Sequence, residues 1–151
     1  MRGKELDIPE TVQGHVVTRA APFAFSRQRQ ITAVSIPDTV DSIGQEAFYI
    51  CPSLQQLKLP ARLKIIEKNA FNCCRALKSV IVPTGTIHID RHAFYDCTAL
   101  KTISIPDTVG FMGEKVFGAD GNAKVECTIV CRQDSYVEHY AKENGILCSF
   151  V

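Results

Sequence analysis

Apolar residues recur along the chain in a short pattern that returns every 23 residues. In each copy, three apolar positions are spaced three and then two residues apart, and a proline follows the last of them. In the copy that ends at Pro60, these positions are Leu54, Leu57 and Leu59. The last two positions alternate with polar residues, as expected for a strand with one buried face. Because proline has no N–H group, it predicts the end of the strand.

A phenylalanine returns with the same period. The five copies are preceded by alanine or, in the last copy, by Val116, and they are Phe25, Phe48, Phe71, Phe94 and Phe117. Neighbouring parallel strands lie about 4.8 Å apart, a spacing at which aromatic rings stack. We therefore expect these rings to be buried and to form a continuous core spine, in preference to a platform for a ligand.

A period of 20–29 residues with the spacing L-x-x-L-x-L is typical of a leucine-rich-repeat solenoid. One copy cannot bury its own apolar face, so the copies must stack. We predict about five 23-residue repeats stacked in parallel and capped at both ends. The return segment carries two more inward positions, such as Leu63 and Ile66, and then too few residues for a long helix. A short helical or 3₁₀ turn is expected there.

A chain of 151 residues fits a single leucine-rich-repeat domain, 1–151, which we divide into three parts. Residues 1–30 form an atypical N-terminal repeat or cap, and residues 31–126 contain the regular repeats. Residues 127–151 form a C-terminal strand-and-helix cap. Terminal repeats of solenoids depart from the pattern because they close the core.

Each predicted cap has a local signal. In the N-terminal part, extra residues around Gly14 predict a tight turn between two short strands. In the C-terminal part, residues 127–131 read as a last strand. Asp134 or Ser135 then caps a helix, and Gly145 ends it.

Composition narrows the function classes. Hydrophobic content of 46% and charged content of 22% are ordinary for a globular protein. The net charge of +1 gives no field that would attract nucleic acid. The chain contains no run of 18 apolar residues, which a membrane-spanning helix would need. Residues 1–10 lack the apolar region of a signal peptide. We expect neither nucleic acid nor a membrane as a partner, and a cytoplasmic location stays open.

Charge is distributed unevenly between neighbouring copies. Residues 55–80 carry a local charge of +5, whereas residues 32–54 carry −3. A basic coil beside an acidic one could bind an acidic partner. An ordinary solvated surface is the simpler interpretation.

The seven cysteines follow the repeat more than they follow a disulfide pattern. Three of them, Cys51, Cys74 and Cys97, are 23 residues apart, so their sulfurs should lie near the coil spacing of about 4.8 Å. A disulfide needs about 2.05 Å, and buried free thiols pack as small apolar groups. We expect a reduced, buried ladder. A pairing of Cys127 or Cys131 with Cys148 stays open.

No motif predicts catalysis. The spacing of His88 and His92 would suit zinc on a helix, but the glutamate of that motif is absent and only one copy has the pair. No C-x-x-C pair, phosphate-binding loop or G-x-S-x-G motif is present. We predict no catalytic residue, no metal and no cofactor. A thiol- or histidine-dependent metal enzyme is a remote alternative.

The phrase Ile-Pro-Asp-Thr-Val-x-x-Ile-Gly-x-x-Ala-Phe-x-x-Cys-x-x-Leu begins at Ile36 and ends at Leu54. It resembles the BspA-type (bacterial surface antigen) leucine-rich repeat, and the resemblance covers about residues 6–126. The tail at residues 134–146 also resembles the closing segment of that family. The resemblance implies a cell-surface or secreted protein that adheres to host matrix or cell-surface proteins. It carries over no ligand, because the matching residues are structural.

The outward strand positions are the candidate binding surface, since the sheet of a solenoid makes its extended binding face. These positions are mostly small and hydroxyl-rich, and they are Ser35, Gln56, Lys58, Ser79, Ile81, Thr102 and Ser104. We predict a non-catalytic module that binds a protein or a glycan. The alternative is an intracellular leucine-rich-repeat scaffold, which the free thiols favour.

Overall fold

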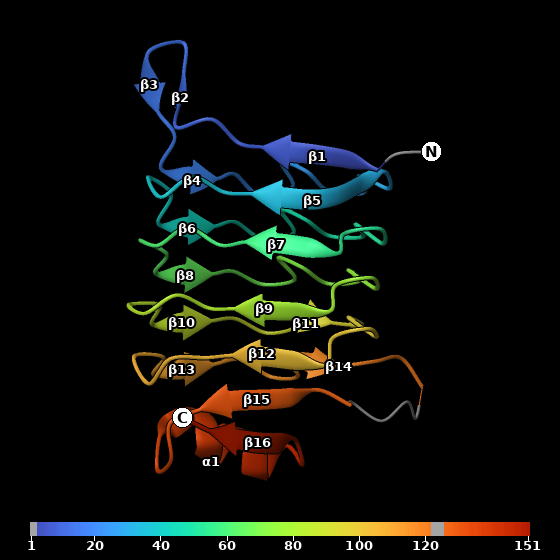
Figure 1. The fold of residues 1–151 in the computed structure, drawn as a ribbon, viewed down its shortest axis with the longest axis vertical. Coiled ribbons are helices and arrows are strands. Elements are labelled where there is room, and N and C mark those ends of the chain that lie inside the picture. The colour runs from blue at the N-terminus through green and yellow to red at the C-terminus, as the bar shows by residue number, and fades with distance from the viewer. Residues whose placement is uncertain (1–2, 122–125) are drawn as a thin grey trace.

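The chain winds as a parallel β-solenoid of about six turns in the computed structural model, which describes residues 3–121 and 126–151 (Figure 1). Residues 122–125, at the end of the predicted regular repeats, lie outside the described residues. The predicted leucine-rich-repeat architecture is confirmed, with five to six repeats.

One long side of the solenoid, here called the front layer, contains the predicted repeat strands. All of its strand pairs are parallel. Its strands are β1 (Lys4–Asp7), β5 (Ile31–Ser35), β7 (Gln56–Lys58), β9 (Ser79–Ile81), β12 (Thr102–Ser104), β15 (Thr128–Cys131) and β16 (Leu147–Phe150). Between regular coils, each residue faces the one 23 positions later, as Val34 faces Leu57. The predicted inward residues of the front-layer strands fill the core.

The return segments form a second parallel sheet, here called the back layer, which the sequence did not predict. Its strands are β4 (Arg19–Ala20), β6 (Ser42–Ile43), β8 (Ile65–Ile66), β10 (His88–Ile89) and β13 (Phe111–Met112). A separate parallel pair follows, β11 (Phe94–Tyr95) with β14 (Phe117–Gly118). The predicted short helical turns are wrong for the described repeats, where turns without helix follow these strands. Inter-coil bonds, such as Phe48 N–H to Ala70 O at 2.8 Å, alternate with single i→i−3 bonds, such as Ala47 N–H to Gly44 O at 3.1 Å. Glu46 also has a φ of 55°, outside the helical region, so no continuous helix forms.

The five phenylalanines form the predicted spine. Successive ring centroids lie 5.2, 5.3, 5.4 and 6.0 Å apart, and all four pairs are stacked. Phe48, Phe71 and Phe94 are buried almost completely, and Phe117 is buried as well. Phe25 is only partly buried, so the prediction that all five are buried is wrong at this position. Phe25 belongs to the first coil of the spine and has a ring neighbour on one side alone.

The predicted N-terminal hairpin is present and projects from the end of the stack (Figure 1). It pairs β2 (Thr11–Val12) with β3 (His15–Val16) in antiparallel fashion. Gln13 and Gly14 make the turn with φ angles of 50° and 81°. Two successive positive φ angles suit a two-residue hairpin, for which glycine is favoured.

The C-terminal helix was predicted with its caps. Helix α1 spans Tyr136–Glu143, and the Ser135 hydroxyl accepts a hydrogen bond from the Glu138 N–H at 3.2 Å. Gly145 follows the C-cap with a φ of 66°, the left-handed conformation that glycine adopts at little cost. The ion pair of Glu138 with Lys142, followed by a bond from the Asp134 N–H, lowers the pKa of Glu138.

Two tyrosines of α1 complete the last coil of the back layer. The Tyr140 hydroxyl accepts from the Val116 N–H at 3.2 Å and donates to the Gly113 carbonyl at 3.0 Å. The Tyr136 hydroxyl accepts from the Met112 N–H at 3.0 Å. These hydroxyls replace the main-chain partners that a further coil would supply. Burial raises the pKa of Tyr140, so the phenol stays protonated and able to donate.

The Phe71→Ala substitution should lower the free energy of unfolding by about 3–5 kcal/mol, the range for a buried phenylalanine. Phe71 is fully buried and lies between two other rings. Phe150→Ala, at a half-exposed ring, is the control and should cost less than about 1 kcal/mol. Urea unfolding of both variants checks this. An equal loss in the two would contradict the spine.

The Tyr140→Phe substitution should lower the free energy of unfolding by about 1–3 kcal/mol, because it leaves the Val116 N–H buried without a partner. Tyr49→Phe is the matched control, since the Tyr49 hydroxyl makes no hydrogen bond to the described residues. Thermal unfolding followed by circular dichroism separates the two. No difference between them would show that the helix is not what closes the core.

Candidate binding surface

The outward side chains of the front layer form two columns along the solenoid. The first outward column runs through Glu5, Ala33, Gln56, Ser79, Thr102, Thr128 and Leu147. The second outward column runs through Asp7, Ser35, Lys58, Ile81, Ser104, Val130 and Ser149. All seven predicted site residues lie in these columns, and each is exposed or half-buried. That they contact a partner stays a prediction.

The sequence reasoning missed the ends of both columns. Glu5 and Asp7 add two acids at the N-terminal end, whereas Val130 and Leu147 add apolar side chains at the C-terminal end. These strands belong to the irregular terminal coils, so the 23-residue register did not reach them. The apolar run at 146–151 was the available signal for β16.

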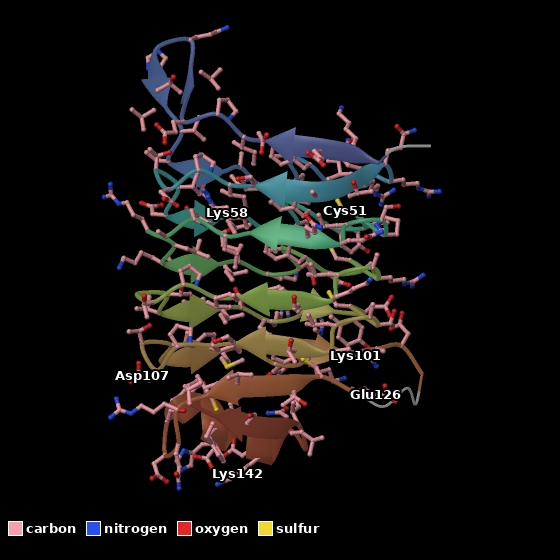
Figure 2. All side chains as sticks on the ribbon, in the orientation of Figure 1. Cys51, Lys58, Lys101, Asp107, Glu126 and Lys142 are labelled. Atoms are coloured by element: carbon pink, nitrogen blue, oxygen red, sulfur yellow. The ribbon has the colours of Figure 1, made fainter. Side chains whose placement is uncertain are left out.

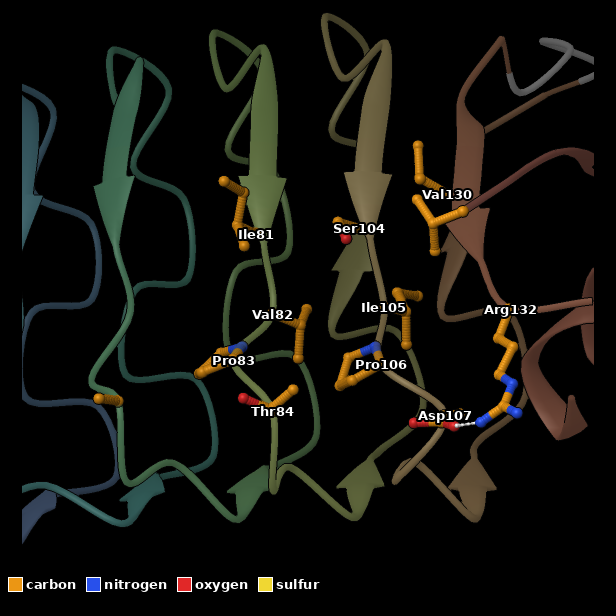
Figure 3. A pocket seen from close by; sticks show the side chains of 12 residues that line it. Ile81, Val82, Pro83, Thr84, Ser104, Ile105, Pro106, Asp107, Val130 and Arg132 are labelled. Carbon is orange, nitrogen blue, oxygen red and sulfur yellow. Dashed lines mark hydrogen bonds and ion pairs between the residues drawn. The ribbon is translucent and has the colours of Figure 1, made fainter.

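Ile81 is the most prominent apolar side chain within the columns, with 76% of its surface exposed. On its C-terminal side lies a hollow of about 530 Å³, lined in part by Ser104, Val130 and Pro106 (Figure 3). Figure 3 shows Ile81, Ser104 and Val130 on neighbouring strands at one end of this hollow. At the other end Arg132 forms an ion pair with Asp107 at 2.9 Å.

A second hollow of about 520 Å³ lies on the N-terminal side of Ile81. Lys58, Ser79 and Ile81 line it, and so does Asp38. Ile81 therefore stands between two hollows of similar size. Figure 2 shows Lys58 on the coil that carries β7.

The cations of the basic coil have different roles. Arg75 donates from Nε and Nη2 to the buried Asp96 carboxylate at 2.8 and 2.6 Å. Lys64 donates to the Gly85 carbonyl at 3.3 Å. The ammonium group of Lys58 has no hydrogen bond or ion pair with the described residues. An acidic group of a partner can therefore pair with the Lys58 ammonium without breaking an existing contact.

The repeating cysteines pack as predicted. Cys51, Cys74 and Cys97 are buried free thiols, and each Sγ donates to the carbonyl of a phenylalanine 26 residues earlier at 3.2–3.3 Å. Desolvation by burial raises the pKa of all three. All seven cysteines are free in the structure, Cys127, Cys131 and Cys148 included.

The two histidines are not brought together at a site. His88 stacks on Phe111 in the back layer, with ring centroids 4.4 Å apart, whereas His92 lies in a turn against Tyr95. Desolvation, followed by the charge of Arg91, lowers the pKa of His92. Within residues 3–121 and 126–151, no cluster of three histidine, cysteine or acidic side chains could hold a metal ion.

Residues 18–141 match the profile of the BspA type leucine rich repeat region in six copies. The chain belongs to the BspA-type leucine-rich-repeat family. The predicted resemblance is thereby confirmed. Membership in the BspA-type family supports a repeat-protein binding module, and BspA-type proteins are typically not catalytic.

Solved structures agree with this assignment. A leucine rich cell surface protein from Faecalibacterium prausnitzii is 30% identical over 80% of this chain, with a TM-score of 0.69. This chain covers 33% of that protein, so it spans about a third of its length. A leucine-rich repeat protein from Bacteroides capillosus is 34% identical over 72% of this chain and 75% of its own, with a TM-score of 0.60.

A more distant structure shows the fold alone. The pneumococcal vaccine antigen PcpA is 15% identical, with a TM-score of 0.71 over 99% of this chain and 41% of its own. A comparison with curated proteins gives no significant match. Of the helices that the structure describes, none has the length and apolar character needed to span a bilayer.

Thiol labelling at pH 8 should modify the half-buried Cys73 and Cys148 first. Burial raises the pKa of Cys127 to about 11 and that of Cys131 to about 11, so at pH 8 both hold less thiolate than an ordinary cysteine. The ladder cysteines should stay silent until denaturant is added. Mass spectrometry of the labelled peptides identifies the order, and rapid labelling of Cys74 in folded protein would contradict it.

Proposed function

We propose that the chain is a non-catalytic protein-binding module of a bacterial cell-surface or secreted protein, and that it binds through the two outward columns. The observation that carries this proposal is the exposed Ile81 between two hollows, beside the unpaired Lys58. Interface energy concentrates at a few residues, and an exposed apolar side chain in a hollowed surface suits such an anchor. The relative from Faecalibacterium prausnitzii is described as a cell surface protein, which supports the location.

A protein is favoured over a glycan as the partner. The described positions of both columns contain no aromatic side chain on which a sugar ring could stack. The C-terminal half instead offers Ile81, Val130 and Leu147. Adhesion to a host matrix or cell-surface protein is the specific form of this proposal that the family resemblance favours.

An intracellular scaffold is the second candidate, and the free thiols favour it. Disulfides are rare in reducing compartments, and all seven cysteines are free in the structure. Fractionation of the source cells with an antibody against the chain separates the two candidates. A signal confined to the cytoplasmic fraction would exclude the surface location and leave the binding role.

The double variant Lys58→Glu with Ile81→Ser should keep the stability of the parent, because both side chains are exposed. Binding to the protein captured by the parent from matrix proteins and cell extract should fall at least tenfold. The matched control, Lys115→Glu with Ile87→Ser, makes the same chemical changes at exposed residues outside the columns. Unchanged binding by the first variant would exclude the columns and make Arg62, Lys64 and Lys68 the next candidates.

A further inference from the structure

The front layer is divided between β7 and β9. The strands on one side form a ladder in the order β1-β5-β7, and those on the other side form the order β16-β15-β12-β9. β7 and β9 lie further apart than the other neighbours of the front layer (Figure 1). The back layer is continuous at the same level, where β8 pairs with β10. The coil that opens has leucine at both inward strand positions, Leu57 and Leu59, where the next coil has valine, and leucine favours strands less than valine does.

Two series of main-chain hydrogen bonds show what is missing. The first series includes Gln55 N–H to Thr32 O at 2.8 Å and Lys101 N–H to Lys78 O at 2.9 Å, but no bond joins Lys78 N–H to Gln55 O. The second includes Ile36 N–H to Lys58 O at 3.1 Å and Val82 N–H to Ser104 O at 2.9 Å.

In the second series, no bond joins Leu59 N–H to Ile81 O. Among the described residues these four main-chain groups have no partner. Each end of the crevice thus holds one free donor and one free acceptor. A hydrogen bond to an unpaired main-chain group therefore stabilises a complex with the partner that supplies it.

The second hollow, of about 520 Å³, opens over this crevice, since residues 55–59 and Ser79 line it. The two ends of the crevice are three residues apart on the β9 side and four on the β7 side, about 10–13 Å at 3.3 Å per residue. Lys58 lies at one end and Lys78 at the other, and neither forms an ion pair with the described residues. Asp38 is the acid in the lining, and its Oδ1 already accepts from the Ala61 N–H at 2.8 Å.

We propose that the crevice between β7 and β9 is the docking position for an extended acidic peptide segment of the partner protein. This inference rests on the proposed function and names the chemistry of the partner. Cα atoms of β7 and β9 lie within 8 Å of each other, and a strand between them needs two spacings of about 4.8 Å, so the two strands must separate further as the segment enters. A peptide group has one N–H and one C=O, which then complement the free donor and acceptor at each end. Carboxylates would pair with Lys58 and Lys78, and an apolar side chain would pack on Ile81. Edge recognition of this kind takes affinity from the main chain and specificity from side chains.

Amide hydrogen exchange measured by NMR tests the crevice in the free protein. The Lys78 and Leu59 amides should exchange at least tenfold faster than the Lys101 and Val82 amides, which occupy the same repeat positions and are bonded. Equal protection of the two sets would show that the strands are paired and would overturn the inference. The proposed function would survive that result, because it needs only the exposed columns.

Titration with the acetylated and amidated peptide Glu-Ser-Val-Ser-Glu tests the occupant. The amide signals of Leu59 and Lys78 should shift, and the peptide Lys-Ser-Val-Ser-Lys should leave them unchanged. The double variant Lys58→Glu with Lys78→Glu should weaken binding at least tenfold, whereas Lys115→Glu, at an exposed lysine outside the columns, should not.

The outcomes separate the two claims. Shifts at β12 or β15 without shifts at Leu59 and Lys78, or equal effects of both peptides, would overturn the crevice as the docking position. The peptide could bind as expected while the captured protein binds the Lys58→Glu with Ile81→Ser variant as tightly as the parent. That result would contradict the proposed function but would leave the crevice as a peptide-binding position. If an uncharged oligosaccharide shifts the Leu59 and Lys78 amide signals and the acidic peptide does not, the partner at the crevice is a glycan and the acidic peptide is excluded.

Discussion

The structure depends on one constraint, which is that no coil can satisfy its own main chain or bury its own apolar face. Each coil bonds to the next at several places, as Phe48 N–H does to Ala70 O and Phe71 N–H does to Ala93 O, both at 2.8 Å. These bonds set the coil spacing, and the ring spacing of about 5 Å in the spine follows from it. The alanine before the first four phenylalanines of the spine is small where the coils approach, and each thiol of the cysteine column donates to a phenylalanine carbonyl. One repeated phrase therefore serves both packing and hydrogen bonding.

The same constraint explains the two ends, where the missing coil must be replaced. At the C-terminus, the hydroxyls of Tyr136 and Tyr140 supply partners for the back layer, while β16 extends the front layer. At the N-terminus, β1 and β4 begin the two sheets, and Phe25 stays partly exposed because no ring of the described residues covers its outer face. Closure is thus more complete at the C-terminal end, where a helix with well-formed caps is available.

The repeat strands, the spine and the cysteine column could be predicted because the 23-residue period makes each position visible several times. Helix α1 was visible because Ser135 and Gly145 are local signals. The back layer was not, since strands of two residues such as Ile65–Ile66 give no alternation and owe their pairing to the neighbouring coil. The columns were predicted only where the register was regular, so Asp7 and Val130 were missed. The break between β7 and β9 consists of missing main-chain hydrogen bonds, which no residue pattern encodes directly. The lower strand preference of Leu57 and Leu59 was the only signal in the sequence, and it is weak.

Inward positions of this solenoid are so constrained that they carry little information about a partner. Even Thr86, which replaces an apolar residue, is fully buried and has its hydroxyl satisfied by the Leu63 carbonyl at 3.1 Å. Outward positions carry no such demand, so a departure from their small, hydroxyl-rich pattern costs little and need not serve the fold. Lys58 and Ile81 are two such departures, and they face each other at the one place within the described front layer where neighbouring strands are unpaired. Two independent departures from the repeat, one in side chains and one in main-chain pairing, therefore coincide at a single position on the surface.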